Sequence, residues 1–371
     1  MSLSERRPIW PMVKQRLAVF DGPFSLIMLL LVLVGLVTLY SAGIDLPGIV
    51  ENQLRNLLVA LVVMWLAANI PPQTLMRLAV PIYAVGIVLL IAVAVAGTVK
   101  LGARRWLNLG VVNFQPSEIM KIAMPLMLAW FFQQREGLIR WREFLIAGLL
   151  LAIPVGLIAK QPDLGTALLV LAAGFYIIFL AGLSWKVLIG LIFAVGGSLP
   201  VVWSMLHNYQ RERIMMLIDP SSDPLGKGFH IIQSTIAVGS GGITGKGWLQ
   251  GTQAHLEFIP ERTTDFIFAV FSEEFGLIGN IVLMLLYLSL IGRGLIIAAN
   301  APTLFTRLLA GAITMTFFTY AFVNMGMVSG ILPVVGVPLP FMSYGGTSLL
   351  TLGLGAGILM SIQKNRKLVQ S

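Results

Sequence analysis

Three short motifs place an acid at the start of an apolar segment. They are "QPSE" at 115–118, "QPD" at 161–163 and "TTD" at 263–265, and their acids are Glu118, Asp163 and Asp265. An acid in the first helical turn answers the helix dipole, and Asp caps free N–H groups, so each has a structural explanation. The alternative is one shared cavity, where helix N-termini favour phosphate and a carboxylate accepts a proton or binds a cation. The residues alone leave both explanations open.

Basic residues accompany these motifs. Lys121 follows Glu118 by three positions, so the two share a helix face and form an internal ion pair, either structural or part of a site. Arg104 and Arg105 bind lipid phosphate in the usual explanation, and a substrate diphosphate in the functional one. The full set of cationic candidates for a departing diphosphate is Arg104, Arg105, Lys121, Lys160, Arg211 and Arg213.

A glycine-rich stretch, "GSGGITGKG" at 239–247, invites comparison with a phosphate-binding loop. The Walker A pattern needs glycine five residues before Gly245, where this chain has Ser240, and Ser or Thr after Lys246, where it has Gly247. The stretch therefore predicts a flexible turn. The three histidines show no metal-binding spacing.

Two consecutive acids, Glu273 and Glu274, fall about two turns beyond Asp265, inside an apolar segment. Placing a carboxylate at that depth in the membrane costs free energy unless it faces a cavity or a cation. They either support the site from behind or line a proton or ion path, which is the feature expected of a transporter.

The composition sets the environment in which these groups act. Of the 371 residues 57% are hydrophobic and only 11% are charged, against about 25% charged in a soluble domain. The chain is therefore an all-α, polytopic integral membrane protein. It has no cysteine, so any metal ligand is oxygen or imidazole, and its basic residues are too scattered for nucleic-acid binding. The first apolar run is too long for a cleavable signal peptide and predicts an anchor.

The apolar runs predict about ten spanning helices and a single membrane domain over residues 1–371. The expected spans are 22–43, 54–72, 75–97, 116–134, 142–160, 163–183, 186–205, 265–292, 304–328 and 342–363. One large hydrophilic loop, 206–264, separates spans seven and eight. The segment before "QPSE" reads as an amphipathic stretch on the membrane surface, with Trp106 as an interfacial anchor.

The basic residues predict the orientation. With both termini in the cytoplasm, the inner segments hold 14 of the 25 Lys and Arg residues, namely Arg6, Arg7, Lys14, Arg16, Arg77, Arg135, Arg140, Arg142, Lys186, Arg293, Arg307, Lys364, Arg366 and Lys367. The positive-inside rule favours this orientation. It makes 206–264 extracytoplasmic and directs the starts of the three acidic motifs outward.

Five stretches together resemble the SEDS family (shape, elongation, division and sporulation), and are more similar to its rod-shape branch than to its division branch. They are "FQPSEIMKIA", "QPDLGTAL", "RIMMLIDPSSDPLGKGFHIIQSTIAVGSGG", "GKGWLQGTQAHLEFIPERTTDFIFAVFSEEFG" and "LPVVGVPLPFMSYGGTS", in the family's order and spacing. The resemblance implies a bacterial inner-membrane glycosyltransferase that polymerises lipid II by inverting transfer on the outer face. Its implied partners are a class B penicillin-binding protein, the lipid-linked glycan chain and membrane proteins of the elongation machinery.

The family's essential aspartate maps to Asp265, its charged pair to Glu118 and Lys121, and the aspartate of its "QPDLGT" motif to Asp163. A base for the attacking hydroxyl suits Asp265, and a Mg²⁺ or Mn²⁺ ion held by Asp265 or Glu118 is a further expectation. Two alternatives stay open. A lipid II flippase predicts inverted repeats, which the sequence lacks, and a non-catalytic scaffold does not explain carboxylates gathered at one mouth.

Overall fold

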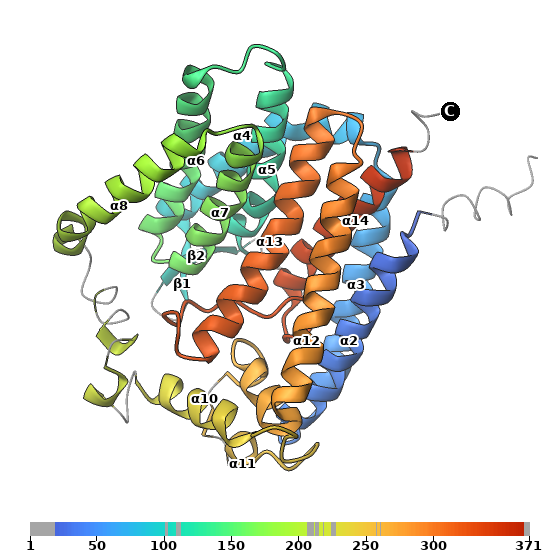
Figure 1. The fold of residues 1–371 in the computed structure, drawn as a ribbon, viewed down its shortest axis with the longest axis vertical. Helices are drawn as coiled ribbons and strands as arrows, with labels where there is room; N and C mark the ends of the chain where they lie inside the picture. The colour runs from blue at the N-terminus through green and yellow to red at the C-terminus, as the bar shows by residue number, and fades with distance from the viewer. Residues whose placement is uncertain are drawn as a thin grey trace, which may run out of the picture.

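The computed structural model describes residues 19–366 except 101–102, 109–112, 206–210, 212–214, 218, 224–227, 257 and 260. Within these residues there are ten long helices, and all of them except α8 pack into one bundle (Figure 1). The ten helices are α2 (Gly22–Ala42), α3 (Ile49–Ala68), α4 (Pro72–Ala96), α5 (Pro116–Gln133), α6 (Trp141–Lys160), α7 (Leu164–Leu180), α8 (Trp185–Met205), α12 (Ile267–Ala299), α13 (Leu304–Val328) and α14 (Gly346–Arg366).

These helices confirm the predicted fold class, and each corresponds to one predicted span with ends that differ by a few residues. In the described part of the chain seven helices are long and apolar enough to cross a bilayer: α2, α3, α4, α6, α12, α13 and α14. The helix α7 is apolar but shorter, and α5 carries Glu118 and Lys121. The protein is therefore an integral membrane protein.

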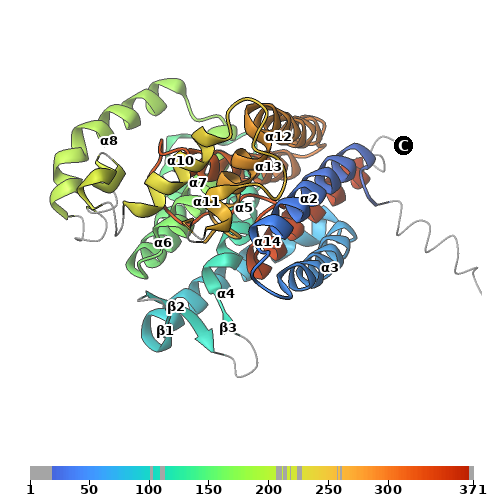
Figure 2. The ribbon, with the colours of Figure 1, turned by 90° about the horizontal axis from the view of Figure 1, so that it is seen from below.

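The loop end of the bundle carries the short elements of the large loop, η1 (Pro220–Ser222), α10 (Phe229–Ser240) and α11 (Thr252–His255), while Gly22 and Arg366 lie at the opposite end (Figure 1). The helix α13 is central. Of the residues in its most apolar part 72% are buried, against 22% of those in the corresponding part of α3. The helix α8 stands apart from the others (Figures 1 and 2), and most of its described side chains are exposed.

The segment before α5 differs from the predicted amphipathic stretch. It forms a small antiparallel sheet, β1 (Thr98–Lys100), β2 (Ala103–Asn108) and β3 (Asn113–Phe114), which projects beside α4 (Figure 2). Lys100 pairs with Ala103, and the Thr98 hydroxyl donates to the Trp106 carbonyl at 3.2 Å. Backbone pairing between these strands satisfies the polar groups that an isolated surface segment would leave to water.

The helix α12 is broken at Gly276, whose backbone (φ 63°, ψ −160°) is not helical. The glycine-rich stretch fills the break. The N–H groups of Lys246 and Gly247 donate to the carbonyls of Glu273 and Glu274, each at 3.0 Å, and those of Leu277 and Ile278 donate to the carbonyls of Gly242 and Ile243 at 2.9 and 3.1 Å. A Cβ at position 245 would lie 2.1 Å from the Glu274 carbonyl oxygen. Gly245 is therefore required by close main-chain packing, and the stretch is an ordered turn, not a flexible one.

The two buried acids of α12 hold this turn in place. The Glu273 carboxylate accepts from Lys246 Nζ at 2.7 Å, from the Thr252 hydroxyl at 3.1 Å and from the Gln253 N–H at 3.0 Å. The Glu274 carboxylate accepts from the Ser41 hydroxyl and from the Leu249 N–H at 3.2 Å. Both acids are thus structural ties between the large loop and α12, and the bonds described give no path for protons.

Candidate functional site at the loop end of the bundle

Asp265 lies in a tight turn, residues 261–266, directly before α12. Arg262 anchors this turn to the end of α2: its guanidinium donates to the Ala42 carbonyl at 2.7 Å and pairs with Asp45 at 3.0 Å. On the other side the Tyr344 N–H donates to the Thr263 carbonyl at 2.9 Å. The main chain around Asp265 is therefore fixed from two directions.

The side chain of Asp265, in contrast, is partly exposed and accepts no hydrogen bond from the described residues. Burial, with a smaller contribution from the nearby Glu261 charge, raises the pKa of Asp265 to about 6. Gly336 (φ +72°) lies against it, and a Cβ there would come within 3.3 Å of Asp265 Oδ2. A carboxylate with free lone pairs and a pKa near neutrality is suited to accept a proton.

His230, on α10, lies beside this turn. Its ring stacks on Phe266 with the centroids 5.9 Å apart. Burial lowers the pKa of His230, opposed by the Glu261 charge. The imidazole is therefore neutral at pH 7, and it contributes no positive charge next to Asp265.

Glu118 and Lys121 form a buried polar cluster with α13 and α14. Lys121 Nζ lies 2.5 Å from Glu118 Oε1, and the Thr351 hydroxyl donates to Glu118 Oε2 at 3.1 Å. The same ammonium lies 5.4 Å from the centroid of the Tyr320 ring. Both oxygens of Glu118 are thus engaged, and the predicted ion pair is present.

Asp163 belongs to a third cluster, at the start of α7. Its Oδ1 accepts from the Thr166 N–H at 3.2 Å, which caps the helix, and its Oδ2 accepts from Gln115 Nε2 at 2.9 Å. Arg105 lies 3.9 Å from the carboxylate and also donates to the Pro162 carbonyl. This cluster ties β2 and the start of α5 to α7.

The other predicted cations are placed less favourably. Lys160 is exposed at the end of α6 and forms no ion pair with a described residue. Arg211 donates to the carbonyls of Trp203 and Ser204 at 3.0 and 2.7 Å, so it caps the end of α8 and is not brought to Asp265. Arg104 lies in β2, but nothing is described of its side chain. Arg213 is not among the described residues.

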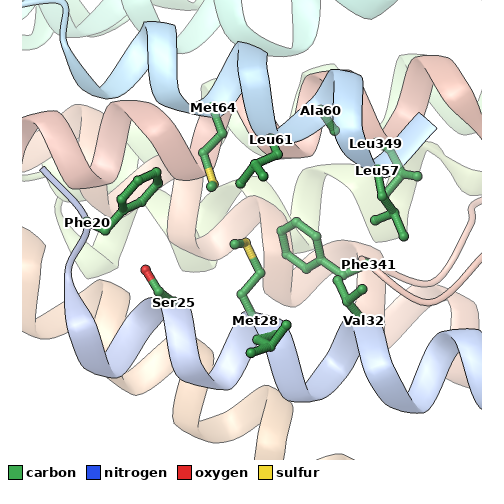
Figure 3. A pocket seen from close by; sticks show the side chains of 12 residues that line it. Phe20, Ser25, Met28, Val32, Leu57, Ala60, Leu61, Met64, Phe341 and Leu349 are labelled. Carbon is green, nitrogen blue, oxygen red and sulfur yellow. The ribbon is translucent and has the colours of Figure 1, made fainter. Parts of the chain in front are cut away.

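Two apolar grooves adjoin α3. One, of about 470 Å³, lies among α3, α4, α5 and α14, and its polar edge is formed by Gln115, Glu118, Thr347 and Thr351. The other, of about 490 Å³, lies between α2 and α3 (Figure 3), and Ser25 is its sole polar side chain. Only the first combines a hydrocarbon-lined space with charge, so only the first suits an amphiphilic ligand.

The donor set for a metal ion is poor. In the described part of the chain no group of three or more His, Cys, Asp or Glu side chains is placed to hold one ion. Glu118 is occupied by Lys121 and Thr351, so the expectation that it binds a cation does not fit. Asp265, with Glu261 nearby, is left as the one predicted ligand with open coordination.

Sequence reasoning missed several residues that build this end of the molecule: Arg262, Tyr320, Asn324, Gly336 and Ser343. A signal for Asn324 was present, because a carboxamide inside an apolar span needs partners and is a functional suspect. No local pattern marks Gly336 or Ser343, which lie in the connection after α13.

Fold and site together define a polytopic membrane protein with acidic side chains at the starts of α5, α7 and α12 and an apolar groove with a polar edge. A family model described as a cell cycle protein, covering FtsW, RodA and SpoVE, matches residues 23–368, and the chain belongs to this family. The resemblance inferred from the five motifs is thereby confirmed.

Relatives of the chain carry names that agree with this membership. The chain is 50% identical over 350 residues to the peptidoglycan glycosyltransferase MrdB of Escherichia coli (strain K12), covering 94% of this chain and 95% of that one. It is 35% identical to the stage V sporulation protein E of Bacillus subtilis (strain 168), with 91% and 95% covered.

Solved structures share the fold. One, on the structural coordination of polymerization and crosslinking by a peptidoglycan synthase complex, matches with a TM-score of 0.81 and 36% identity, covering 94% of this chain and 98% of that one. The rod shape determining protein RodA of Thermus thermophilus matches with a TM-score of 0.71 and 29% identity, covering 94% and 97%.

Proposed function

We propose that this chain is a peptidoglycan glycosyltransferase that polymerises lipid II during cell elongation, with loss of undecaprenyl diphosphate. The observation that carries the proposal is Asp265, an unpaired carboxylate with a pKa of about 6 on a rigid turn, in a chain that is 50% identical to a peptidoglycan glycosyltransferase. A partly buried acid whose carboxylate accepts no hydrogen bond from the described residues is suited to general-base catalysis.

In this proposal Asp265 accepts the proton of the acceptor sugar hydroxyl as that oxygen attacks the anomeric carbon of the donor. The new carbon–oxygen bond forms while the bond to the diphosphate breaks, so the electron pair leaves with undecaprenyl diphosphate. The attack is a single displacement with inversion. Burial, together with the smaller effect of the nearby Glu261 charge, raises the pKa of Asp265 and makes it basic enough to act near neutral pH.

The leaving diphosphate needs positive charge, and the groove beside α5 supplies a location for it. Glu118 lies at the polar edge of an apolar space of about 470 Å³, which suits a lipid chain with a charged head, and the buried Lys121 pairs with Glu118 behind that edge. Arg105, on β2 beside Asp163, is a second candidate for this positive charge. A divalent cation at Asp265 is a further proposal: it would neutralise diphosphate charge, with substrate oxygens completing its coordination.

We further propose a class B penicillin-binding protein as partner and the bacterial inner membrane as location. Support for the partner comes from the similarity to a chain of a complex that coordinates polymerization and crosslinking. The orientation, with both termini in the cytoplasm and 206–264 outside, is supported by the distribution of basic residues.

The orientation is tested with single cysteines, since the chain has none. Variants Ser4→Cys and Ser222→Cys are treated on intact spheroplasts with a membrane-impermeant thiol reagent. Position 222 should be labelled and position 4 should not. The opposite pattern would refute the orientation.

The function is tested with the purified chain and its penicillin-binding partner in vesicles given labelled lipid II. A glycosyltransferase yields glycan polymer. A lipid II flippase, the competing function, yields translocated lipid II without polymer, and buried acids lining a path through the bundle would have favoured it. Because Glu273 and Glu274 instead bind loop backbone and side chains, the structure gives no support to that alternative.

A further inference from the structure

A single carboxamide connects the two main-chain segments that meet at Asp265. Asn324 is fully buried on α13, and its Nδ2 donates to the Asp265 carbonyl at 2.8 Å and to the Val337 carbonyl at 2.7 Å. One amide group therefore joins the residue before α12 to the residue after Gly336. Since both partners are carbonyl oxygens, the orientation of the amide is fixed: Nδ2 must face them.

A second contact of the same kind lies one residue away. The Ser343 hydroxyl, 2% exposed, donates to the Thr264 carbonyl at 2.6 Å and accepts from the Leu339 N–H at 2.8 Å. The connection after α13 is thus joined to the turn that carries Asp265 directly at Ser343 and, through Asn324, at Val337. Gln53 of α3 supports it from behind by donating to the Ser343 carbonyl at 3.0 Å.

These contacts fix the position of the Asp265 side chain without touching it. The carbonyls of residues 264 and 265 are both bound, so the direction of the Cα–Cβ bond at Asp265 is set. Gly336, next to the Val337 carbonyl, lies close enough that a Cβ there would meet Asp265 Oδ2 at 3.3 Å. The same amide therefore sets the separation between the carboxylate and the backbone opposite it.

We infer that Asn324 and Ser343 are positioning residues that hold the Asp265 carboxylate in its reactive place by binding the main chain on either side of it. The inference rests on the proposed function, in which Asp265 is the base. Loss of alignment by about 1 Å is enough to reduce a rate by about 10²-fold. Positioning residues of this kind change turnover more than substrate binding.

Each positioning residue has a matched control elsewhere in the bundle. Asn324→Leu removes both donors at nearly constant volume, and Asn324→Asp keeps the shape while placing an acceptor against two carbonyls. Asn280→Leu is the control for the carboxamide, because Asn280 is bonded to Ser272 and not to the Asp265 turn. Ser361→Ala is the control for Ser343→Ala, since Ser361 is equally buried and donates to the Ile70 carbonyl.

The test measures kcat and KM for lipid II polymerisation by the full chain with its penicillin-binding partner, per folded molecule as judged by size exclusion and thermal unfolding. Asn324→Leu and Asn324→Asp should each lower kcat by about 10²-fold and Ser343→Ala by about 10-fold, with KM nearly unchanged. Both controls should keep kcat within about threefold of the wild type. A purely structural role would lower the unfolding temperature and leave kcat per folded molecule intact.

If folded Asn324→Leu and Ser343→Ala both keep the wild-type kcat, or change only KM, the inference is wrong. Should the Asn324 variants fail to fold, the milder Ser343→Ala decides alone. Asp265→Asn in the same assay distinguishes a failure of the proposed function from a failure of the positioning role alone. If it stays active, the proposed base and this inference fail together. If it is inactive while the Asn324 and Ser343 variants are active, only the positioning role fails.

Discussion

The starts of α7 and α12, "QPDLGT" and "RTTDFI", share one feature: an aspartate lies one residue before α7 and two residues before α12. At α7 both oxygens of Asp163 are engaged, by the Thr166 N–H, Gln115 and Arg105. At α12 the Asp265 carboxylate accepts nothing from the described residues, while its main chain is bound by Asn324.

The difference shows how one residue type serves two purposes. A carboxylate that accepts several hydrogen bonds stabilises structure and is a weak base, because its charged form is already satisfied. A carboxylate that is partly desolvated and unpaired becomes more basic, which is the condition of Asp265. Rigidity at α12 comes from the main chain instead, so the side chain stays available.

The largest expected effect is at Asp265. Asp265→Asn keeps the shape but cannot accept the hydroxyl proton, and loss of a general base typically removes about 10²–10⁴-fold of rate. The variant should accumulate in the membrane, bind its partner and make essentially no glycan. Thr264→Ala, its neighbour, should be much milder. Retention of more than about a tenth of wild-type polymerisation would remove the assignment of Asp265 as base.

The Glu118–Lys121 pair should come next. Replacing both with apolar residues of similar volume is nearly neutral if the pair is only structural. We expect a folded variant that loses about 10²-fold in polymerisation, because the polar edge of the groove loses Glu118 together with the positive charge proposed to stabilise the leaving diphosphate. The measurement is polymer yield per folded molecule. Normal activity of the double variant would return the pair to a structural role.

The α7 side of the comparison predicts a change in stability more than in rate. Asp163→Ala removes a helix cap and should lower stability by about 1 kcal/mol. Asp163→Asn keeps the cap but loses the partly exposed pairing with Arg105 and the oxygen that accepts from Gln115, whose amide has to turn over, so its stability loss should not exceed that of Asp163→Ala. Thermal unfolding and kcat are measured together. A rate loss for Asp163→Asn as large as that for Asp265→Asn would end the distinction between the two aspartates.

The smallest effect concerns pH. The pKa of Asp265 is about 6, raised first by burial and then by Glu261. A base acts when deprotonated, so kcat should fall as pH drops through about 6. Glu261→Gln removes the repelling charge, lowers the pKa of Asp265, and moves this acid limb to lower pH with little change at pH 8. An acid limb that stays in place, or moves upward, would mean that another group controls it.

The sequence by itself determined the class of fold. Hydrophobic runs of about 20 residues need no tertiary information, because a bilayer admits only segments that satisfy their own backbone. All ten predicted spans are present as helices, with ends shifted by a few residues. The helix starts that carry acidic motifs could also be predicted, because helix capping depends on residues that are close in the sequence. Motif order was enough to identify the family.

Only the tertiary structure decided which acids are free and which are used. Glu273 and Glu274 could have lined a path, but the glycine-rich turn covers them through contacts at a sequence separation that no local pattern encodes. The hairpin before α5 depends on pairing between strands and was missed. Asn324, Gly336 and Ser343 meet Asp265 because α13, α12 and the connection between α13 and α14 converge. Neighbours that are distant in the sequence decide whether the lone pairs of a carboxylate are engaged or left open. The difference between Asp163 and Asp265 depends on these neighbours.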